Sequence, residues 1–532
     1  MASKRTFLQS LRHWACWAAL AVFVLAVVGG VYLGIRLSTD RAESFDDPVA
    51  QFKYGSTGGD KNFGIPYVIW QAMPVLFKQY LPKGREDEGW AAFGFIYEDA
   101  ASLPEGFGRP RPVGTSLRNF MGIERTFVNC AICHTGTVRT EADATPILYV
   151  GMGANRIDLQ AFQDFMIAAA LDERFTPEHI LAQIDDMGLE IDLINRLALR
   201  IVGIYQVRER ILTIAQRFRF AHDEPAFGPG RFDTFSPAKA LLNWPLDGIP
   251  ERERIGVVDF PSIWLQAQRD GMQLHWDGNN TKLAERNRSA AFGTGALPPI
   301  LDRESMKRVE DWLLDLAPPP FAETFPGQID KSLLARGQEV YEAECAACHG
   351  LNGRDFAGEY VGKVTPIGEI GTDRHRFDSY TYDLAVGQNV LYAEFGDERF
   401  QNFRKTDGYA NMPLDGVWLR APYLHNGSVP TLWDLLQPPD QRPAVFYRGY
   451  DVYDPANVGY ESRPEKIPAD QRARLFCFQT RLVSPSVCAT PPQNNNTCSF
   501  GGCDGNGNGG HAYGTTLADT DKRALVEYLK TF

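Results

Sequence analysis

The arrangement of apolar and polar positions changes several times along the chain. From Trp14 to Ile35 there are 22 residues without a charge, which as a helix would span roughly 30 Å, the thickness of a bilayer's hydrocarbon core. Apolar residues three and four apart between residues 155 and 220 predict amphipathic helices, and further helical patterns precede residue 345 and follow residue 517. Strand signals are few. The pattern predicts a mainly α fold behind an N-terminal transmembrane helix.

Changes in composition divide the chain into segments. A proline-rich stretch, APPPFAETFPG, separates two helical patterns and predicts a linker. A chain of 532 residues exceeds what one hydrophobic core usually serves, so two domains are expected. The predicted segments are residues 1–13 (cytoplasmic n-region), 14–35 (transmembrane anchor), 36–62 (tether), 63–316 (N-terminal domain with a helical insertion), 317–327 (linker) and 328–532 (C-terminal domain).

Charge indicates which side of a membrane the chain occupies. The 54 basic and 66 acidic residues give a formal net charge of -12, which argues against nucleic acid as a partner. Lys4, Arg5 and Arg12 precede the apolar run, so the positive-inside rule predicts a single-pass protein of a bacterial inner membrane with its soluble part in the periplasm. A cleaved signal peptide followed by secretion is the alternative. An uncleaved anchor is favoured because no small-residue cleavage site follows the run.

Five of the nine cysteines lie outside any obvious chemical motif. Cys16 belongs to the apolar run, whereas Cys477, Cys488, Cys498 and Cys503 cluster near the C-terminus. Outside the cytoplasm an even, clustered set predicts two disulfides. Three pairings are possible, and the short loops favour Cys477 with Cys488 and Cys498 with Cys503.

The other four cysteines occur in two CxxCH motifs, NCAICHTGT and CAACHG. In an exported chain this motif indicates covalent haem attachment, with two thioether bonds to the porphyrin and the adjacent histidine on the iron. The alternatives are a thioredoxin-like redox pair or half of a zinc site, but neither copy has a second zinc ligand pair nearby. The sequence predicts two haem c groups, one on Cys130 and Cys133 with His134 as proximal ligand, the other on Cys345 and Cys348 with His349.

The sixth iron position distinguishes electron transfer from peroxide reduction or dioxygen activation. His511 lies in the glycine-rich loop GNGNGGHAYG, which lets backbone approach a flat porphyrin, and is the candidate ligand of the second haem. Met412 is the alternative there, and His425 is expected close to that haem. Met152 is the alternative axial ligand after the first motif.

Two further stretches, HWDGNNTKLAERN and LRAPYLHNGSVPTLWDLL, resemble motifs of the bacterial di-haem cytochrome c peroxidases. The resemblance implies a reactive N-terminal haem, a C-terminal haem that relays electrons, and Trp276 between them. The chain also departs from that family. Arg286 replaces a glutamine, Ala296 replaces the glutamate that serves as acid and base, and Pro439 stands where a distal methionine is expected, which favours His511.

The stretches FKYGSTGGDKNFGIPYVIW, GPGRFDTFSPAK and ERNRSAAFGTG are more similar to the di-haem rubber oxygenases, which cleave an isoprenoid double bond with dioxygen. That resemblance implies that Phe292 lines the distal face of the first haem and that His511 is the sixth ligand of the second. His275 replaces an aromatic residue, and three roles stay open for it: a hydrogen bond to bound oxygen, an iron ligand, or a solvent-facing side chain.

Calcium is an optional further cofactor, since the peroxidases hold one between their domains. The stretch DGNGNG matches the first half of a calcium loop, but position twelve is Thr515 rather than glutamate. A glycine turn is the preferred interpretation of this stretch.

The expected function is that of a membrane-anchored di-haem oxidoreductase in which electrons pass from the C-terminal haem to a peroxide- or dioxygen-reactive N-terminal haem. The expected partners are a periplasmic electron donor or acceptor, a small oxidant, and the membrane through the N-terminal helix. A pure electron-transfer cytochrome without its own substrate is the alternative.

Overall fold

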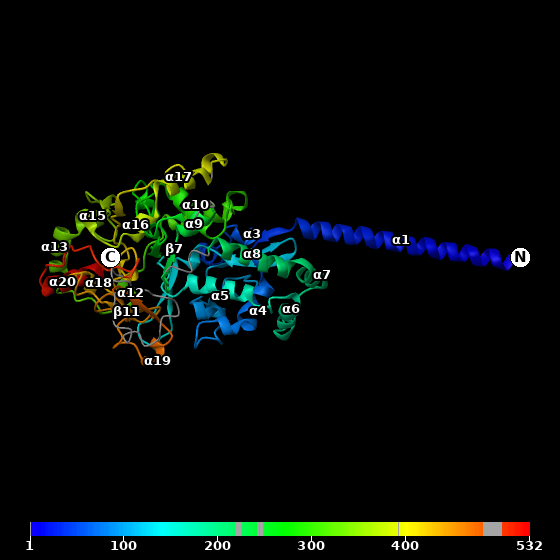
Figure 1. Cartoon of the computed structure of the whole chain (residues 1–532), viewed down its shortest axis with the longest axis horizontal. Coiled ribbons are helices and arrows are strands. Elements are labelled where there is room, and N and C mark those ends of the chain that lie inside the picture. The colour runs from blue at the N-terminus through cyan, green and yellow to red at the C-terminus, as the bar shows by residue number, and fades with distance from the viewer. Residues whose placement is uncertain (1, 219–224, 242–243, 245–247, 392, 482–502) are drawn as a thin grey trace.

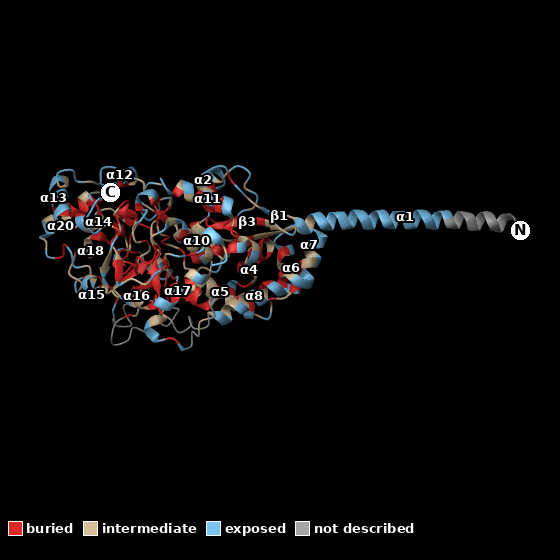
Figure 2. Cartoon of the chain, turned by 90° about the horizontal axis from the view of Figure 1, so that it is seen from above, coloured by how far each residue is buried: buried red, intermediate tan, exposed pale blue. Residues whose placement is uncertain are grey.

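The computed structural model describes residues 2–218, 225–241, 244, 248–391, 393–481 and 503–532. Helix α1 (Ala2–Ser38) projects from an elongated body that contains the rest of the chain (Figure 1). Within the described residues, one helix is long and apolar enough to cross a membrane, over His13–Ser38. Its side chains are exposed along this length (Figure 2), as a lipid-facing helix requires.

The residues predicted to form a tether are folded. Strand β1 (Asp40–Ala42) follows α1 after one residue and joins a sheet, and α2 (Pro48–Tyr54) begins at an Asp47 side chain that accepts hydrogen bonds from two backbone N–H groups. Phe52 and Tyr54 are fully buried. Residues 40–62 therefore belong to the folded body, and one residue separates α1 from the first strand of the sheet.

Strands are more numerous than the sequence pattern indicated, so the mainly α prediction is only partly right. An antiparallel sheet has the order β1-β3-β4-β2. Its central hairpin turns at Met121 and Gly122, both with positive φ, as a tight two-residue turn requires. The other strands of this sheet are β2 (Ile65–Pro66), β3 (Thr115–Phe120) and β4 (Ile123–Val128).

The remaining strands of the described residues form antiparallel two-stranded ribbons. They are β5 (Thr135–Val138) with β6 (Ile147–Val150), β7 (Arg231–Asp233) with β8 (Val257–Asp259), β9 (Val364–Pro366) with β10 (Gly408–Ala410), β11 (Val445–Arg448) with β14 (Phe476–Gln479), and β12 (Tyr453–Asp454) with β13 (Gly459–Tyr460).

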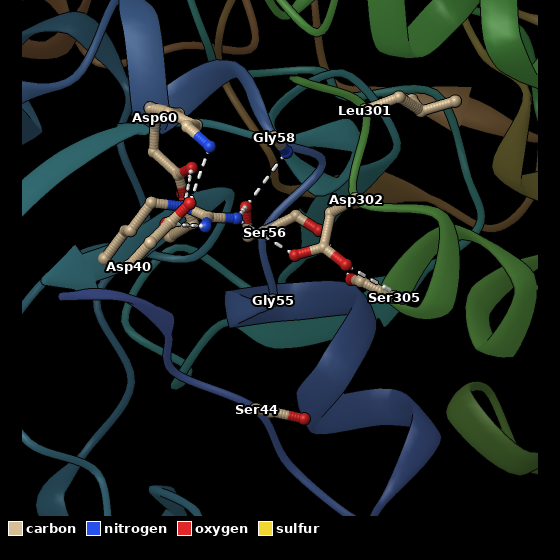
Figure 3. A network of polar contacts seen from close by, with 12 residues as sticks. Asp40, Ser44, Gly55, Ser56, Gly58, Asp60, Leu301, Asp302 and Ser305 are labelled. Atoms are coloured by element: carbon tan, nitrogen blue, oxygen red, sulfur yellow. Dashed lines mark hydrogen bonds and ion pairs between the residues drawn. The ribbon is translucent and has the colours of Figure 1, made fainter. Parts of the chain in front are cut away.

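A buried guanidinium fastens the base of α1 to the sheet. Arg118 of β3 donates to Asp60 at 2.7 Å and to Asp302 at 3.0 Å, and it also pairs with Asp40 of β1. It donates to the Ser56 hydroxyl as well, so the network joins four separate segments (Figure 3). Because the charge is met by three carboxylates, its burial does not leave it unpaired.

The amphipathic helices predicted between residues 155 and 220 are confirmed. Asp158, Thr176 and Asp192 each cap a helix through a side-chain oxygen that accepts a backbone N–H. The buried faces of these helices pack onto an aromatic core in which Trp70 and Trp90 stack at 4.2 Å. The helices are α5 (Leu159–Leu171), α6 (Pro177–Asp186), α7 (Leu193–Ala198), the π-helical turn η5 (Leu199–Gly203) and α8 (Ile204–Arg217), and α4 (Tyr67–Leu76) lies beneath them.

The C-terminal half is built around α13 (Leu334–Glu344) and the predicted terminal helix α20 (Asp519–Leu529), which is confirmed. They cross closely at Gly337, where a Cβ atom would lie 2.1 Å from the Ala524 carbonyl oxygen. The other α-helices of the N-terminal half are α3 (Gly59–Asn62), α9 (Ser236–Leu241), α10 (Leu283–Gly293) and α11 (Arg303–Leu313). Those that follow along the chain are α12 (Phe321–Thr324), α14 (Ala346–His349), α15 (Ile367–Ile370), α16 (His375–Ser379), α17 (Tyr382–Leu391), α18 (Leu432–Leu435) and α19 (Ala469–Arg472).

The predicted linker is part of a core that both halves share. Phe321 and Phe325, inside residues 317–327, are buried against Trp418. Val138 and Trp264 from the N-terminal half pack into the same cluster. The proline-rich stretch therefore holds the two halves together instead of separating them.

Candidate functional site

The first CxxCH motif forms one short turn at the end of β4. The Asn129 side chain accepts from the Ala131 N–H and donates to the carbonyls of Lys53 and Gly55, so the start of the turn is fixed from both sides. Cys130 follows directly, in a 3-10 turn that ends one residue before Cys133. Both thiols and the adjacent imidazole are thus presented from a single rigid turn, which covalent haem attachment requires.

The proximal histidine of the first motif is held by a backbone carbonyl. His134 Nδ1 lies 2.9 Å from the Pro261 oxygen, a contact in which the ring N–H donates. Burial, with a contribution from the Arg286 charge, lowers the pKa of His134 to about 3, so the ring is neutral. A neutral imidazole that donates from Nδ1 presents the Nε2 lone pair to a metal.

The second motif repeats this arrangement. Helix α13 runs into α14, which carries Cys348 and His349. His349 Nδ1 lies 2.7 Å from the Met412 carbonyl oxygen, and burial lowers the pKa of His349. Because Nδ1 and Nε2 point away from each other, the Met412 backbone lies behind the ring, on the side opposite a bound metal. This placement favours another residue over Met412 as sixth ligand.

The structure brings His511 opposite His349. The two ring centroids are 6.1 Å apart, with ring planes inclined at 43°. Two imidazoles at this spacing would hold one metal ion between them. Burial, with the neighbouring His349, lowers the pKa of His511 to about 3. The pair therefore fits the two axial positions of one haem iron.

The loop that carries His511 is strained and clamped. His511 has a φ of 43°, a conformation that costs energy in a side-chain-bearing residue and persists only when its surroundings impose it. The guanidinium of Arg442 donates to the carbonyls of Asn508 at 2.7 Å, Gly510 at 2.8 Å and His511 at 3.0 Å. Arg442, which the sequence did not single out, thus positions the histidine through its backbone.

Trp276 lies between the two proximal histidines in the hydrogen-bond network. Its indole N–H donates to the Asp259 carbonyl at 2.9 Å, and its own carbonyl accepts from the Ala410 N–H at 2.8 Å. Asp259 is two residues before Pro261, and Ala410 is two residues before Met412. Four hydrogen bonds and short backbone segments therefore form a continuous route between the two CxxCH histidines.

The first site gathers polar groups that have no partner. His275 has a φ of 63°, and its Nε2 is buried without a hydrogen bond. Burial and the Arg286 charge lower the pKa of His275 well below its usual value. The Arg286 guanidinium makes no hydrogen bond or ion pair within the described segments, and burial lowers the pKa of Arg286 to about 10. The Arg286 charge also lowers the pKa of Cys130 and of His134, so it lies near the first CxxCH turn.

Aromatic side chains lie next to His275. Phe292, near the end of α10, packs against Phe400 and Phe403. The His275 ring is 6.2 Å from that of Phe403. His275 and Phe292, predicted to line the distal side of the first haem, therefore share a neighbour, and their roles stay predictions.

Two other predicted residues occupy different positions. His425 stacks on Tyr409 at 4.1 Å, and its carbonyl accepts from the Asp259 N–H, so it lies beside the Trp276 route. Met152 is fully buried with Val138 in the shared core. The structure gives neither residue a contact with a CxxCH histidine among its described contacts, and their proposed haem roles remain predictions.

The chemistry of the first site lacks the usual proton carrier. Ala296, at the position of the peroxidase glutamate, is buried among Ala291, Leu301 and Met306. A different carboxyl group, that of Glu310 on α11, acts electrostatically on Cys130, and burial raises the pKa of Glu310. No motif in the sequence points to this carboxyl group.

The calcium-like stretch is held by an arginine. Buried Arg231 donates to the Asn506 side chain at 2.7 Å and to the Gly505 carbonyl at 2.8 Å. Asn426 donates to the Gly505 and Gly507 carbonyls. The side-chain oxygen of Asn506, at position three of a calcium loop that would begin at Asp504, is thus taken by a cation. The described residues contain no cluster of three or more acidic, histidine or cysteine ligands.

Two of the four clustered C-terminal cysteines lie within the described residues. Cys477 and Cys503 are each disulfide-bonded, whereas Cys488 and Cys498 lie outside the described residues. The pairing therefore stays a prediction. Among the described cysteines, the free ones are Cys16 and the four of the CxxCH motifs.

Two family models match segments of the C-terminal half. Residues 334–406, which include the second CxxCH motif, match the cytochrome c family model. Residues 408–447, which include Met412 and His425, match the model described as RoxA-like, cytochrome c-like.

Two relatives come from Sinorhizobium fredii. The uncharacterized protein y4iM is 31% identical over 251 residues, which cover 42% of this chain and 55% of that protein. The uncharacterized protein y4iJ is 24% identical over 627 residues, which cover 97% of this chain and 99% of that protein. The chain thus spans little more than half of the first relative and nearly all of the second.

The matches and the geometry agree on the nature of the second site. A cytochrome c domain implies covalently bound haem c, and the α13–α14 turn supplies its two thiols and a neutral imidazole. The C-terminal half of this chain is therefore cytochrome c-like, with similarity to the RoxA-like cytochromes and the haem-based redox function that this similarity suggests.

Proposed function

We propose that the protein is a membrane-anchored, periplasm-facing cytochrome with two covalent haem c groups. Electrons enter at the C-terminal haem and pass through the Trp276 region to an N-terminal haem that reacts with a small oxidant, peroxide or dioxygen. Haem supplies one-electron chemistry and, where one axial position is open, reaction with small oxidants. The residues around each haem determine which site transfers electrons and which reacts with the oxidant.

The second site is suited to electron transfer. His349 and His511 are neutral, half-buried and at the spacing of two ligands on one metal. A haem with two protein ligands mostly transfers electrons, because no position remains for a substrate. Arg442 keeps the second ligand in place by holding its loop.

The first site is suited to an oxidant. Arg286 carries a positive charge near the first CxxCH turn and has no hydrogen bond or ion pair among the described residues. A guanidinium stabilises an anionic or polarised ligand by a charge-assisted hydrogen bond. With Ala296 at the usual acid position, proton delivery depends on other groups, so peroxide turnover should be well below that of a peroxidase.

The observation that carries the proposal is the continuous route from His134 to His349 through Trp276. It joins the two attachment turns through the tryptophan that the peroxidase resemblance singles out. A carrier with two independent haems would not need this connection.

Replacement of Trp276 by phenylalanine tests the route. The variant loses the indole N–H that donates to Asp259 and should exchange electrons between the haems more slowly, while it retains both haems. The measurement is the redistribution of electrons after a substoichiometric pulse of reductant, followed by stopped-flow absorbance. Trp433→Phe, in α18, is the matched control. Equal exchange rates in all three proteins would contradict the proposed route.

The number of haems has its own test. Cys345→Ala with Cys348→Ala should leave one covalent haem per chain with an unchanged spectrum. Two covalent haems in that variant would refute the assignment.

A pure electron carrier is the second candidate, and the unpartnered Nε2 of His275 favours it. If His275 binds the first iron, both irons have two protein ligands, and neither binds cyanide or carbon monoxide. His275→Ala would then create a ligand-binding haem where the native protein has none.

A further inference from the structure

We propose that the exposed apolar face of the α7–η5–α8 helix lies on the outer surface of the membrane that α1 crosses. This inference rests on the proposed anchorage by α1 and is independent of the haem assignments. The occupant of the face is the lipid bilayer at the level of its headgroups and upper acyl chains.

The face consists of large apolar side chains on one side of a continuous helix. The opposite side of the same helix is buried in the body, where Leu199, Ile204 and Val207 pack into the aromatic core. The helix therefore has two apolar sides, of which a globular fold needs only one. The exposed residues are Leu193 (81% exposed), Ile194, Leu197, Ile201, Val202 and Tyr205. Within this set, residues 193, 197 and 201 are four apart, and the pairs 194/197 and 202/205 are three apart, which are the spacings of neighbours on one side of a helix.

The face lies where the transmembrane helix enters the body. Arg36, at the end of the uncharged run, donates to the Gly122 carbonyl at 3.1 Å and to Asp192 at 3.4 Å, and it also bonds the Asn195 side chain of α7. The exposed Met121 sits in the same turn as Gly122. A residue that ends a membrane span lies at the lipid–water boundary, so α7 is held at that level.

The connection leaves little freedom to tilt the face away. Strand β1 begins one residue after α1, pairs with β3, and is fixed by Arg118 through Asp40 (Figure 3). In both views of the chain, α7 lies at the end of the body from which α1 projects (Figures 1 and 2). A bilayer around α1 therefore meets α7 first, and the C-terminal half points away from it.

The chemistry of the helix fits an interfacial position. Arg200 is exposed on the flank of the apolar face. Helices that lie in the membrane interface combine an apolar face, sunk to the headgroup boundary, with basic side chains that contact lipid phosphates. Contact with lipid also removes from water an apolar surface that would otherwise promote aggregation.

A second helix supplies a matched control. Helix α17 also exposes apolar residues at helical spacing, including Val386 (63% exposed), but it is farther from α1 in both views (Figures 1 and 2). Exposure alone would predict the same environment for both helices. With the bilayer at the end of the body from which α1 projects, the exposed side chains of α7 contact lipid and those of α17 contact water.

The test uses the full-length protein in liposomes of phosphatidylcholine and phosphatidylglycerol. In a Cys16→Ser background, single cysteines at Leu197, Ile201, Val386 and Val24 are labelled with a nitroxide. Electron paramagnetic resonance then compares the accessibility of each label to oxygen, which concentrates in lipid, and to a water-soluble nickel complex. Haem absorbance confirms that each variant is folded.

The expected result is a raised oxygen-to-nickel ratio at Leu197→Cys and Ile201→Cys, and the ratio of an aqueous site at Val386→Cys. Water-like ratios at both α7 positions, with a lipid-like ratio at Val24→Cys, would overturn the docking while leaving the anchorage by α1 intact. A water-like ratio at Val24→Cys would refute the anchorage and the docking together.

Discussion

The two CxxCH sites share the contact that orients the histidine ring through Nδ1, but they differ in the groups that lie on the other side of the ring. In both, a ring N–H donates to a distant backbone carbonyl, Pro261 for one and Met412 for the other. In front of His349 stands a second neutral imidazole on a clamped loop. The first site has instead an unpartnered guanidinium and an unpartnered histidine nitrogen. The orientation of the CxxCH histidine is thus common to both sites. Under the proposed function, the groups on the opposite side make one site a closed electron-transfer site and the other a site that receives a ligand.

The largest expected effect comes from opening the closed site. His511→Ala removes one of two axial ligands, so the second haem should become five-coordinate and bind carbon monoxide or cyanide. Its potential should shift by an amount on the order of 0.1 V, within the range of about 0.8 V that axial ligands cover. Visible absorption and redox titration measure both changes.

The matched control for that change is His179→Ala. This exposed histidine on α6 contacts only Thr176 in its own helix cap and should alter neither haem. An unchanged second haem in the His511→Ala protein would mean that His511 is not its sixth ligand. The second site would then lack the paired imidazole that distinguishes it from the first.

The clamp on the His511 loop should have a large effect on stability. Arg442→Gln leaves several buried carbonyls without a charged donor, which should lower the free energy of unfolding by about 3 kcal/mol, since hydrogen bonds to charged groups contribute about 1.5–3 kcal/mol. A fraction of the second haem should lose its sixth ligand. Thermal unfolding in detergent and the high-spin absorbance report these effects, and Arg481→Gln is the exposed control.

The corresponding arginine of the first site should behave in the opposite way. Arg286→Met removes a half-buried charge that has no hydrogen bond or ion pair among the described residues, so stability should stay the same or rise by about 1 kcal/mol. Cyanide affinity of the first haem should fall by about tenfold, which corresponds to one hydrogen bond to a charged group. Isothermal titration with cyanide measures the affinity. If the variant instead unfolds easily, Arg286 has a structural partner and the comparison between the two arginines fails.

The smallest expected effect concerns pH and the loop of the second site. Burial alone would lower the pKa of His375, but the hydrogen bond to Asp373 and the charges of Asp373 and Asp504 outweigh it and raise that pKa. Asp373 also accepts from the Gly507 N–H, so the pair supports the loop.

A histidine whose folded pKa is raised stabilises the fold below its ordinary pKa of about 6.5, and that stabilisation is lost as pH rises through the folded value. His375→Gln should therefore flatten the decline of the melting temperature on the alkaline side of pH 6.5. His179→Gln should keep the native slope. Identical slopes in all three proteins would remove His375 from the loop's support.

Local patterns revealed the attachment turns, the helices between residues 155 and 220 and the terminal helix, because spacing along the chain determines them. The carbonyls that orient the two histidines could not be found in this way, since Pro261 is 127 residues from His134. Met412 was identified for its side chain, whereas its carbonyl makes the contact. The hairpin at Met121 and Gly122 gave little signal, because Met-Gly is not among the dipeptides, such as Asn-Gly and Asp-Gly, that mark a two-residue hairpin turn. Arg442 had no local signal because its partners are backbone atoms.

The most direct test of the difference between the two sites is the coordination of each iron in the native protein. Electron paramagnetic resonance and near-infrared magnetic circular dichroism of the ferric full-length protein, before and after cyanide, distinguish paired imidazole ligands from an open or weakly held position. The geometry predicts one iron with two histidine ligands that cyanide leaves untouched, and one iron whose signal cyanide changes. Two irons that both bind cyanide, or two that both resist it, would contradict the proposal.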